Sequence, residues 1–162
     1  MAPSTEELRT AMETTLKTFL ENYHVAVRDK NISILSAVLS PDCKRYLKPS
    51  GFVETYPFMK AVESNAEYEA RMMPEFGTME ETRVKILESV IDPVNRKASA
   101  RAEHWTKIVN NEPTTLEVCW WLDFTDDGTK VSRVVEFIDT AVATQMIANM
   151  MKQGDRKDEH TA

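Results

Sequence analysis

The sequence predicts a single α+β domain in which helices come first and strands follow. Before about residue 72, apolar residues recur at helical spacing, and after residue 82 they alternate with a period of two. The dipeptide Asp127-Gly128 between two alternating runs is a strong signal for a β-hairpin. Helices and strands that are segregated along a chain are typical of α+β proteins.

The first half of the chain is predicted to be helical. Ser4 and Glu7 form a Ser-x-x-Glu capping box, and apolar residues then follow at helical spacing as far as Val27. Pro41 ends a second, short helix, and Pro74 and Gly77 close a third. The expected helices lie at about residues 5–28, 31–39 and 55–72. The segment from 41 to 53, with its basic cluster, is expected to be irregular.

The second half is predicted to form a four-stranded antiparallel meander followed by a closing helix. The expected strands cover residues 82–91, 97–109, 114–125 and 130–138, and the helix covers 140–152. We expect residues 1–152 to form the domain and residues 153–162 to be a disordered polar tail. A curved sheet wrapped around the long N-terminal helix would enclose a cone-shaped cavity.

Composition excludes several classes of function. The chain has 162 residues, which fits one domain, and a formal net charge of −6, which argues against nucleic acid and anionic membranes as partners. No apolar run reaches the ~18 residues of a membrane span, and no basic segment followed by an apolar stretch marks a secretory signal. We therefore expect a cytoplasmic protein.

No metal or cofactor is expected from the motifs. Cys43 and Cys119 match no metal or redox spacing, so they are expected as reduced thiols, with one disulfide as the alternative. The histidines are far apart in sequence, and no glycine-rich phosphate loop or dinucleotide fingerprint is present.

The strand pattern assigns side chains to faces of the sheet. If Asn110-Asn111 and Asp127-Gly128 are both two-residue turns, one face mixes small, ionisable and aromatic residues. Its functional candidates are His104, Glu117, Cys119, Trp121 and Glu136. The opposite face, with Trp105, Trp120, Phe124 and Phe137, is apolar and is expected to pack on another subunit or on a helix; we predict a dimer built on it. A loop of three or five residues would reverse one strand and change this assignment.

Five segments carry a resemblance to a known superfamily. They are Asp42-Cys43 with Pro49, Ser64–Ala70, Trp120–Phe124, Asp127–Val131 and Glu136–Asp139. Through them, residues ~15 to 150 resemble the NTF2-like superfamily, and within it the SnoaL-like polyketide cyclases and a fungal group of isomerases and cyclases. The resemblance implies a cone of N-terminal helices packed in the concave face of a curved antiparallel sheet. It also implies a cofactor-free, usually dimeric enzyme that acts on polycyclic substrates by acid–base chemistry.

The resemblance and the face assignment together give the candidate site. The resemblance implies proton transfer by Glu136 and a basic residue near the pocket, Arg45 or alternatively Lys44. The face assignment adds His104, whose imidazole titrates in the useful range. Asp139 is either catalytic or a helix cap. The residues expected to bind substrate are Phe19, Tyr23, Tyr46, Glu117, Cys119 and Trp121.

The expected function is a cofactor-independent isomerase or cyclase of secondary metabolism. Its substrate would be a polycyclic intermediate, most naturally a dihydroxanthone-type polyketide or a meroterpenoid, and the enzyme would be a homodimer. Two alternatives stay open at this point. The domain could be a non-catalytic module for dimerisation or small-ligand binding, or a dehydratase built on the same fold.

Overall fold

The computed structural model describes residues 3–159, and the side chains of residues 3–152. Four α-helices, one 3-10 helix (η1) and six strands follow one another along the chain. Their bounds are α1 Thr5–Asp29, η1 Ile32–Ser36, β1 Leu39–Lys48, α2 Ser50–Thr55, β2 Val62–Ser64, α3 Asn65–Phe76, β3 Met79–Asp92, β4 Lys97–Ile108, β5 Thr114–Phe124, β6 Val131–Ile138 and α4 Thr140–Glu159.

Helix α1 begins and ends as its sequence indicates. The Ser4 hydroxyl accepts a hydrogen bond from the Glu7 backbone N–H, and the Glu7 carboxylate accepts one from the Ser4 backbone N–H. The helix ends where Lys30 adopts a left-handed conformation with φ of 53°. Its apolar stripe, which includes the fully buried Met12, packs against the sheet. The predicted capping box and helix are therefore confirmed.

The sheet has six strands rather than the four predicted. Their order is β2-β1-β6-β5-β4-β3, with β1 parallel to β6 and all other neighbours antiparallel. The expectation of an irregular segment at 41–53 is wrong, because β1 runs through it and α2 follows. Pro41 and an irregularity in register between Leu39 and Lys44 conceal the strand in the sequence. From Cys43 onward, alternate residues of β1 are buried.

Helix α3 begins later than predicted. The segment from residue 55 to 61 leads from α2 into the short strand β2, and Ser64 then caps α3 through a second capping box with Glu67. Pro74 lies inside the helix, which continues to Phe76. The predicted helix at 55–72 is thus displaced toward the C-terminus.

The side chains predicted for one face of strand β5 lie on the other face, because the registers of β5 with β4 and with β6 both differ by one residue from the prediction. The connection from β4 occupies residues 109–113 rather than two residues, so His104 lies opposite Leu116 and not Glu117. In the second hairpin, Phe124 lies opposite Val131, as a two-residue turn at Asp127-Gly128 predicts. An irregularity beside Phe124 then shifts the register. Trp120, instead of Cys119, consequently lies opposite Glu136.

The two shifts cancel between β4 and β6. A one-residue change of register moves all side chains of a strand to the opposite face. The faces of β5 are therefore exchanged relative to β4 and to β6, whereas β4 and β6 keep the predicted relation to each other. His104 and Glu136 therefore share the concave face, as predicted, and Trp120 lies between them in place of Trp121. The prediction that Glu117, Cys119 and Trp121 belong to this face is wrong.

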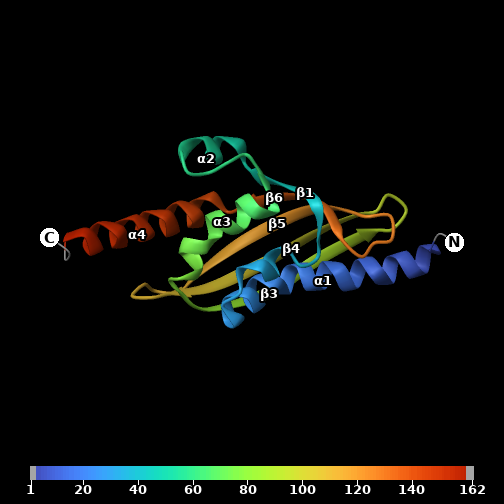
Figure 1. The fold of residues 1–162 in the computed structure, drawn as a ribbon, viewed down its shortest axis with the longest axis horizontal. Coiled ribbons are helices and arrows are strands. Elements are labelled where there is room, and N and C mark those ends of the chain that lie inside the picture. The colour runs from blue at the N-terminus through green and yellow to red at the C-terminus, as the bar shows by residue number, and fades with distance from the viewer. Residues whose placement is uncertain (1–2, 160–162) are drawn as a thin grey trace.

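The helices α1 and α3 lie on the same face of the sheet, and α4 extends from the sheet at the end opposite the N-terminus (Figure 1). Asp139 accepts hydrogen bonds from the backbone N–H groups of Ala141 and Val142 through its Oδ1 atom. It is therefore a helix cap. Helix α4 continues to Glu159, past the predicted end of the domain at 152, and residues 160–162 lie outside the described part of the chain. Within residues 3–159, no helix combines the length and apolar character that crossing a membrane requires.

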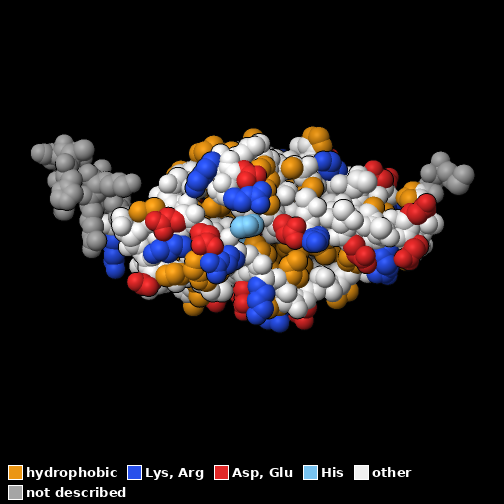
Figure 2. Space-filling model, turned by 90° about the horizontal axis from the view of Figure 1, so that it is seen from below, with side chains coloured by type: hydrophobic (Ala, Val, Ile, Leu, Met, Phe, Trp, Pro, Cys, Tyr) orange, Lys and Arg blue, Asp and Glu red, His pale blue; other side chains and the backbone are white. Residues whose placement is uncertain are grey.

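The surface carries charges of both signs. Figure 2 shows acidic and basic side chains interspersed with apolar ones over one face of the molecule. Several of these charges pair across strands, such as Lys97 with Asp123 and Arg101 with Glu88. Exposed pairs of this kind contribute little to stability, because water and salt screen their charges.

Candidate functional site

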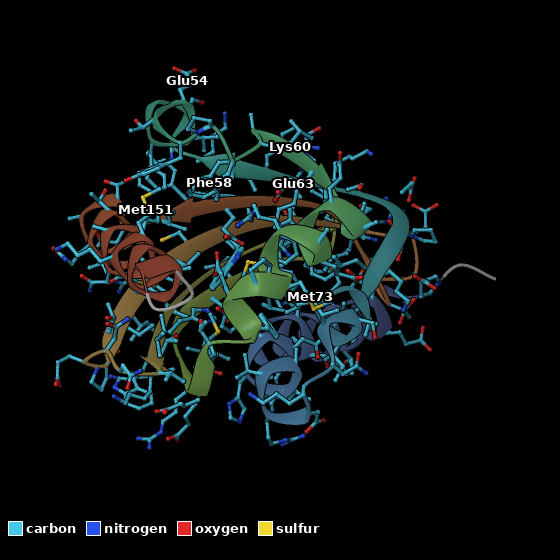
Figure 3. All side chains as sticks on the ribbon, turned by 60° about the vertical axis from the view of Figure 1, so that its left-hand side comes forward. Glu54, Phe58, Lys60, Glu63, Met73 and Met151 are labelled. Atoms are coloured by element: carbon cyan, nitrogen blue, oxygen red, sulfur yellow. The ribbon has the colours of Figure 1, made fainter. Side chains whose placement is uncertain are left out.

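A cavity of about 160 Å³ lies between the concave face of the sheet and the helices α1, α3 and α4. Most of its wall is apolar, including four methionines: Met59, Met72, Met146 and Met150. The polar and ionisable side chains of the wall are Asn22, Tyr23, Arg45, Tyr68, Arg71, Glu75, His104, Thr106 and Glu136. Figure 3 looks onto the helices around this region, with Met73 of α3 and Met151 of α4 on their exposed surfaces.

Arg45 and Glu136 form an ion pair inside the cavity. Their side chains are only 7% and 15% exposed, and Nη1 of Arg45 donates to Oε2 of Glu136. The same oxygen accepts a hydrogen bond from Nε1 of Trp120 at 3.1 Å. An adjacent guanidinium favours the ionised form of a carboxylate. Arg45 and Trp120 therefore fix the position of the Glu136 carboxyl group on the cavity wall.

Aromatic rings hold Arg45 in place. Its guanidinium carbon lies 3.9 Å from the centre of the Tyr68 ring and 5.7 Å from that of Phe19. Burial raises the pKa of Tyr68 to about 12, although the charge of Arg45 acts in the opposite direction. The Tyr68 hydroxyl consequently stays protonated, and the ring acts as a cation–π support for Arg45.

His104 lies beside this pair with its ring between two aromatic side chains. Its ring centre is 5.4 Å from that of Tyr23 and 5.4 Å from that of Trp120. Burial lowers the pKa of His104 to about 4, although the charge of Glu136 acts in the opposite direction. The imidazole is thus neutral near pH 7, and its Nε2 has no hydrogen-bond partner among the described residues. Trp120 contacts both groups: its ring packs against His104, and its Nε1 donates to Glu136.

Helix α3 contributes residues that the sequence did not single out. Tyr68, Arg71 and Glu75 follow one another at spacings of three and four, which places them on one face of the helix. Arg71 donates from Nε and Nη2 to the two carboxylate oxygens of Glu63, at 2.7 and 3.0 Å. Glu63 is 2% exposed and lies on β2, directly before α3 (Figure 3). In the sequence, this spacing indicates only that the three residues share one face of a helix. It is equally typical of a solvent-exposed face and so does not show that they line a cavity.

The structure separates the predicted substrate-binding residues into two groups. Phe19 and Tyr23 line the cavity, together with the predicted catalytic residues Arg45, His104 and Glu136. The other predicted residues lie outside it on the convex face of the sheet: Tyr46, Glu117, Cys119 and Trp121. Glu117 pairs there with Arg101 at 2.9 Å, and Trp121 is 51% exposed. Glu117, Cys119 and Trp121 lie on the convex face because the two faces of β5 are exchanged relative to the prediction.

Tyr46 lies outside the cavity for a different reason. It is part of strand β1 rather than of a loop, so it alternates with the inward-facing Arg45. Its ring instead lies 4.9 Å from the guanidinium carbon of Arg133. Within the described residues, no three His, Cys, Asp or Glu side chains are grouped in a way that could hold a metal ion.

Solved structures share this fold. BvnE pinacolase from Penicillium brevicompactum is 14% identical, with a TM-score of 0.77 over 93% of this chain and 97% of that one. PrhC from Penicillium brasilianum is 16% identical, with a TM-score of 0.75 over 91% and 92% of the two chains. An NTF2-like protein from Burkholderia pseudomallei is 17% identical, with a TM-score of 0.63 over 85% and 95%.

The chain has the NTF2-like fold. The predicted α+β architecture of this NTF2-like, SnoaL-like type is therefore confirmed, with a curved sheet around the N-terminal helix. No protein-family model matches the sequence, and no curated protein matches it. At these identities the likeness establishes the fold alone, because one fold hosts many unrelated functions.

Proposed function

We propose that this NTF2-like protein is a cofactor-independent isomerase or cyclase that moves a proton within a bound polycyclic intermediate of secondary metabolism. The observation that carries the proposal is a carboxylate, Glu136, fixed by Arg45 on the wall of an apolar cavity. The fold is shared with a protein named as a pinacolase, which supports an enzyme of rearrangement type. A dihydroxanthone-type polyketide or a meroterpenoid would suit the aromatic and methionine-rich wall.

The geometry suits general acid–base chemistry. Oε2 of Glu136 makes the contacts to Arg45 and Trp120, whereas Oε1 receives no hydrogen bond from the described residues. Oε1 would accept a proton from a carbon atom next to a carbonyl group. The neutral imidazole of His104 would hydrogen-bond to the substrate and help to place it.

Replacing Glu136 by glutamine is expected to reduce proton transfer by ~10²-fold or more, because the amide keeps the shape of the carboxylate but accepts no proton. The measurement is the exchange of the α-hydrogens of 2-tetralone, an enolisable bicyclic ketone, for deuterium in D₂O, followed by NMR. Glu117→Gln on the convex face is the matched control, and circular dichroism checks folding. Exchange at the wild-type rate in Glu136→Gln would place the chemistry elsewhere. If the wild type binds the ketone without exchange, the protein is a binding module.

We further propose that the protein is a homodimer formed through the convex face of the sheet. The sequence predicted Trp120 and Phe124 on this face, but both are buried in the core. The convex face instead carries Tyr46, Val135 and Trp121, which form a row across the neighbouring strands β1, β6 and β5. Phe137, 44% exposed, extends this apolar area. Light scattering is expected to give twice the mass of the chain, and Trp121→Glu is expected to give the single-chain mass. A wild-type protein that stays monomeric at micromolar concentration would refute the proposal.

A further inference from the structure

Glu75 is an ionisable group of the cavity for which the proton-transfer scheme above has no role. It lies near the C-terminal end of α3 and lines the cavity. Its carboxyl group has no hydrogen bond or ion pair with any described residue. Arg71, one turn earlier, is its natural helical partner, but that guanidinium is directed to Glu63.

The surroundings of Glu75 favour its protonated form. Burial raises the pKa of Glu75, the nearby charge of Arg71 opposes this rise, and the charges of Glu136 and Glu63 add to it. Glu136, in contrast, is paired with Arg45. The cavity therefore holds two carboxyl groups in opposite environments, one without an ion-pair partner among the described residues and one paired with a guanidinium. Such a division is how enzymes separate a general acid from a general base.

The other ionisable groups of the cavity are less suited to donate a proton. The pKa of His104 is lowered to about 4 by burial, so the imidazole carries no extra proton near pH 7. Burial raises the pKa of Tyr23 well above its usual range, and its hydroxyl donates to Sδ of Met79 at 3.4 Å. Tyr68 is likewise held in its neutral form, with a pKa of about 12 caused by burial.

We propose that Glu75 is the catalytic acid of this site and that the substrate is an uncharged, enolisable ketone. Its carbonyl oxygen would face Glu75 on α3, and the acidic C–H group would face Glu136 on β6. This inference rests on the proposed function, because it assigns the second half of the same proton transfer. An uncharged ketone is favoured because Arg45 and Arg71 are already paired with Glu136 and Glu63, so the described part of the cavity wall holds no unpaired arginine or lysine for an anionic substrate.

The proposed reaction is balanced in protons and electrons without a cofactor. Glu136 takes the proton from the α-carbon, the C–H electrons form the C=C bond, and the carbonyl oxygen takes the proton of Glu75. The products are an enol, a protonated Glu136 and a Glu75 carboxylate. In a substrate whose enol is conjugated with a further C=C bond, the enol then returns its O–H proton to Glu75, the C=O bond re-forms, the C=C electrons shift along the conjugated system, and its terminal carbon takes the proton of Glu136. The net result is an isomer of the ketone, with both carboxyl groups back in their starting states.

The decisive experiment compares Glu75→Gln, Glu136→Gln and the wild type for deuterium exchange into 2-tetralone over pD 5–9. The wild-type rate is expected to fall as pD rises through the raised pKa of Glu75, because the acid form is active and is lost on deprotonation. Glu75→Gln is expected to exchange ~10²-fold more slowly and to lose this alkaline limb. Glu69→Gln, which changes a glutamate of the same helix outside the cavity wall, is the matched control.

The outcomes separate this inference from the proposed function. A Glu75→Gln protein with the wild-type rate and pD profile, beside an inactive Glu136→Gln protein, overturns the role of Glu75 and leaves the proposed function in place. A Glu136→Gln protein with wild-type exchange overturns both. The pD profile of the wild type needs no variant, so a wild-type rate that stays constant across the range also refutes Glu75 as the acid. The binding of 2-naphthol, an analogue of the enol, checks by fluorescence that each variant retains the cavity.

Discussion

Replacing Glu63 by alanine is expected to lower the free energy of unfolding by about 3–5 kcal/mol. Glu63 is 2% exposed, and both of its carboxylate oxygens accept hydrogen bonds from Arg71, whose side chain is 16% exposed. Removing one partner of a buried ion pair leaves the other charge buried and uncompensated, and this desolvation dominates the loss. Chemical denaturation of the two proteins at pH 7 measures the difference.

A second variant distinguishes the unpaired charge from a loss of packing. Glu63→Met combined with Arg71→Met removes both charges at similar volume and is expected to recover most of the lost stability. The neighbouring pair of Lys60 with Glu67 is the control, because its side chains are 60% and 45% exposed. Lys60→Ala is expected to leave the free energy of unfolding nearly unchanged, because this pair is exposed to solvent. A loss of similar size in Glu63→Ala would show that the buried pair contributes little.

The pair of Glu63 and Arg71 also bears on the chemistry of the cavity. While Glu63 binds Arg71, Glu75 forms no ion pair with that guanidinium, whose nearby charge opposes the rise in the pKa of Glu75 but does not cancel it. Without Glu63, Arg71 would be free to turn toward Glu75, which lies one turn further along α3. The alkaline limb of proton transfer should then move to lower pH, since an adjacent guanidinium favours the carboxylate. A structural ion pair outside the reaction would in this way set the protonation state of the proposed acid.

Local signals in the sequence predict helix α1 and the presence of the two hairpins, but neither the start of α3 nor the registers of the hairpins. The Ser4–Glu7 capping box starts α1, and Asp127-Gly128 sets the first pairs of the β5–β6 hairpin. Registers depend on single residues, and the sequence does not show the irregularity beside Phe124 or the length of the preceding loop. Strand β1 was missed because its partner, β6, lies far along the chain and pairs with it in parallel.

The candidate site was predicted only in part, for reasons that follow from the same geometry. His104 and Glu136 share a face because two errors of one residue cancel between β4 and β6. Trp121 and Trp120 are adjacent, so a single shift exchanges the exposed indole for the one that contacts Glu136. Glu75 and Arg71 are polar residues on a helix, and only the packing of that helix over the sheet places them inside the cavity.

Acidification is expected to destabilise the protein through His104. Burial lowers the pKa of His104 to about 4 in the folded state, whereas an unfolded histidine has a pKa of ~6.5. Between these values the unfolded chain binds the proton and the folded chain does not. Stability is therefore fully present above pH 6.5 and is lost as the pH falls toward 4. The difference in pKa corresponds to a loss of about 3 kcal/mol from this one group.

Comparison with His104→Gln isolates this contribution from that of the carboxylates, which also respond to acid. The free energy of unfolding, measured by urea denaturation at pH 7 and pH 4, is expected to fall by about 3 kcal/mol less in His104→Gln than in the wild type. His24→Gln removes a histidine outside the cavity wall and controls for the substitution itself. An equal loss of stability on acidification in His104→Gln and the wild type would mean that the imidazole is already charged, or is solvated, in the folded protein. His104 could then not act as the neutral hydrogen-bonding group that the proposed mechanism assigns to it.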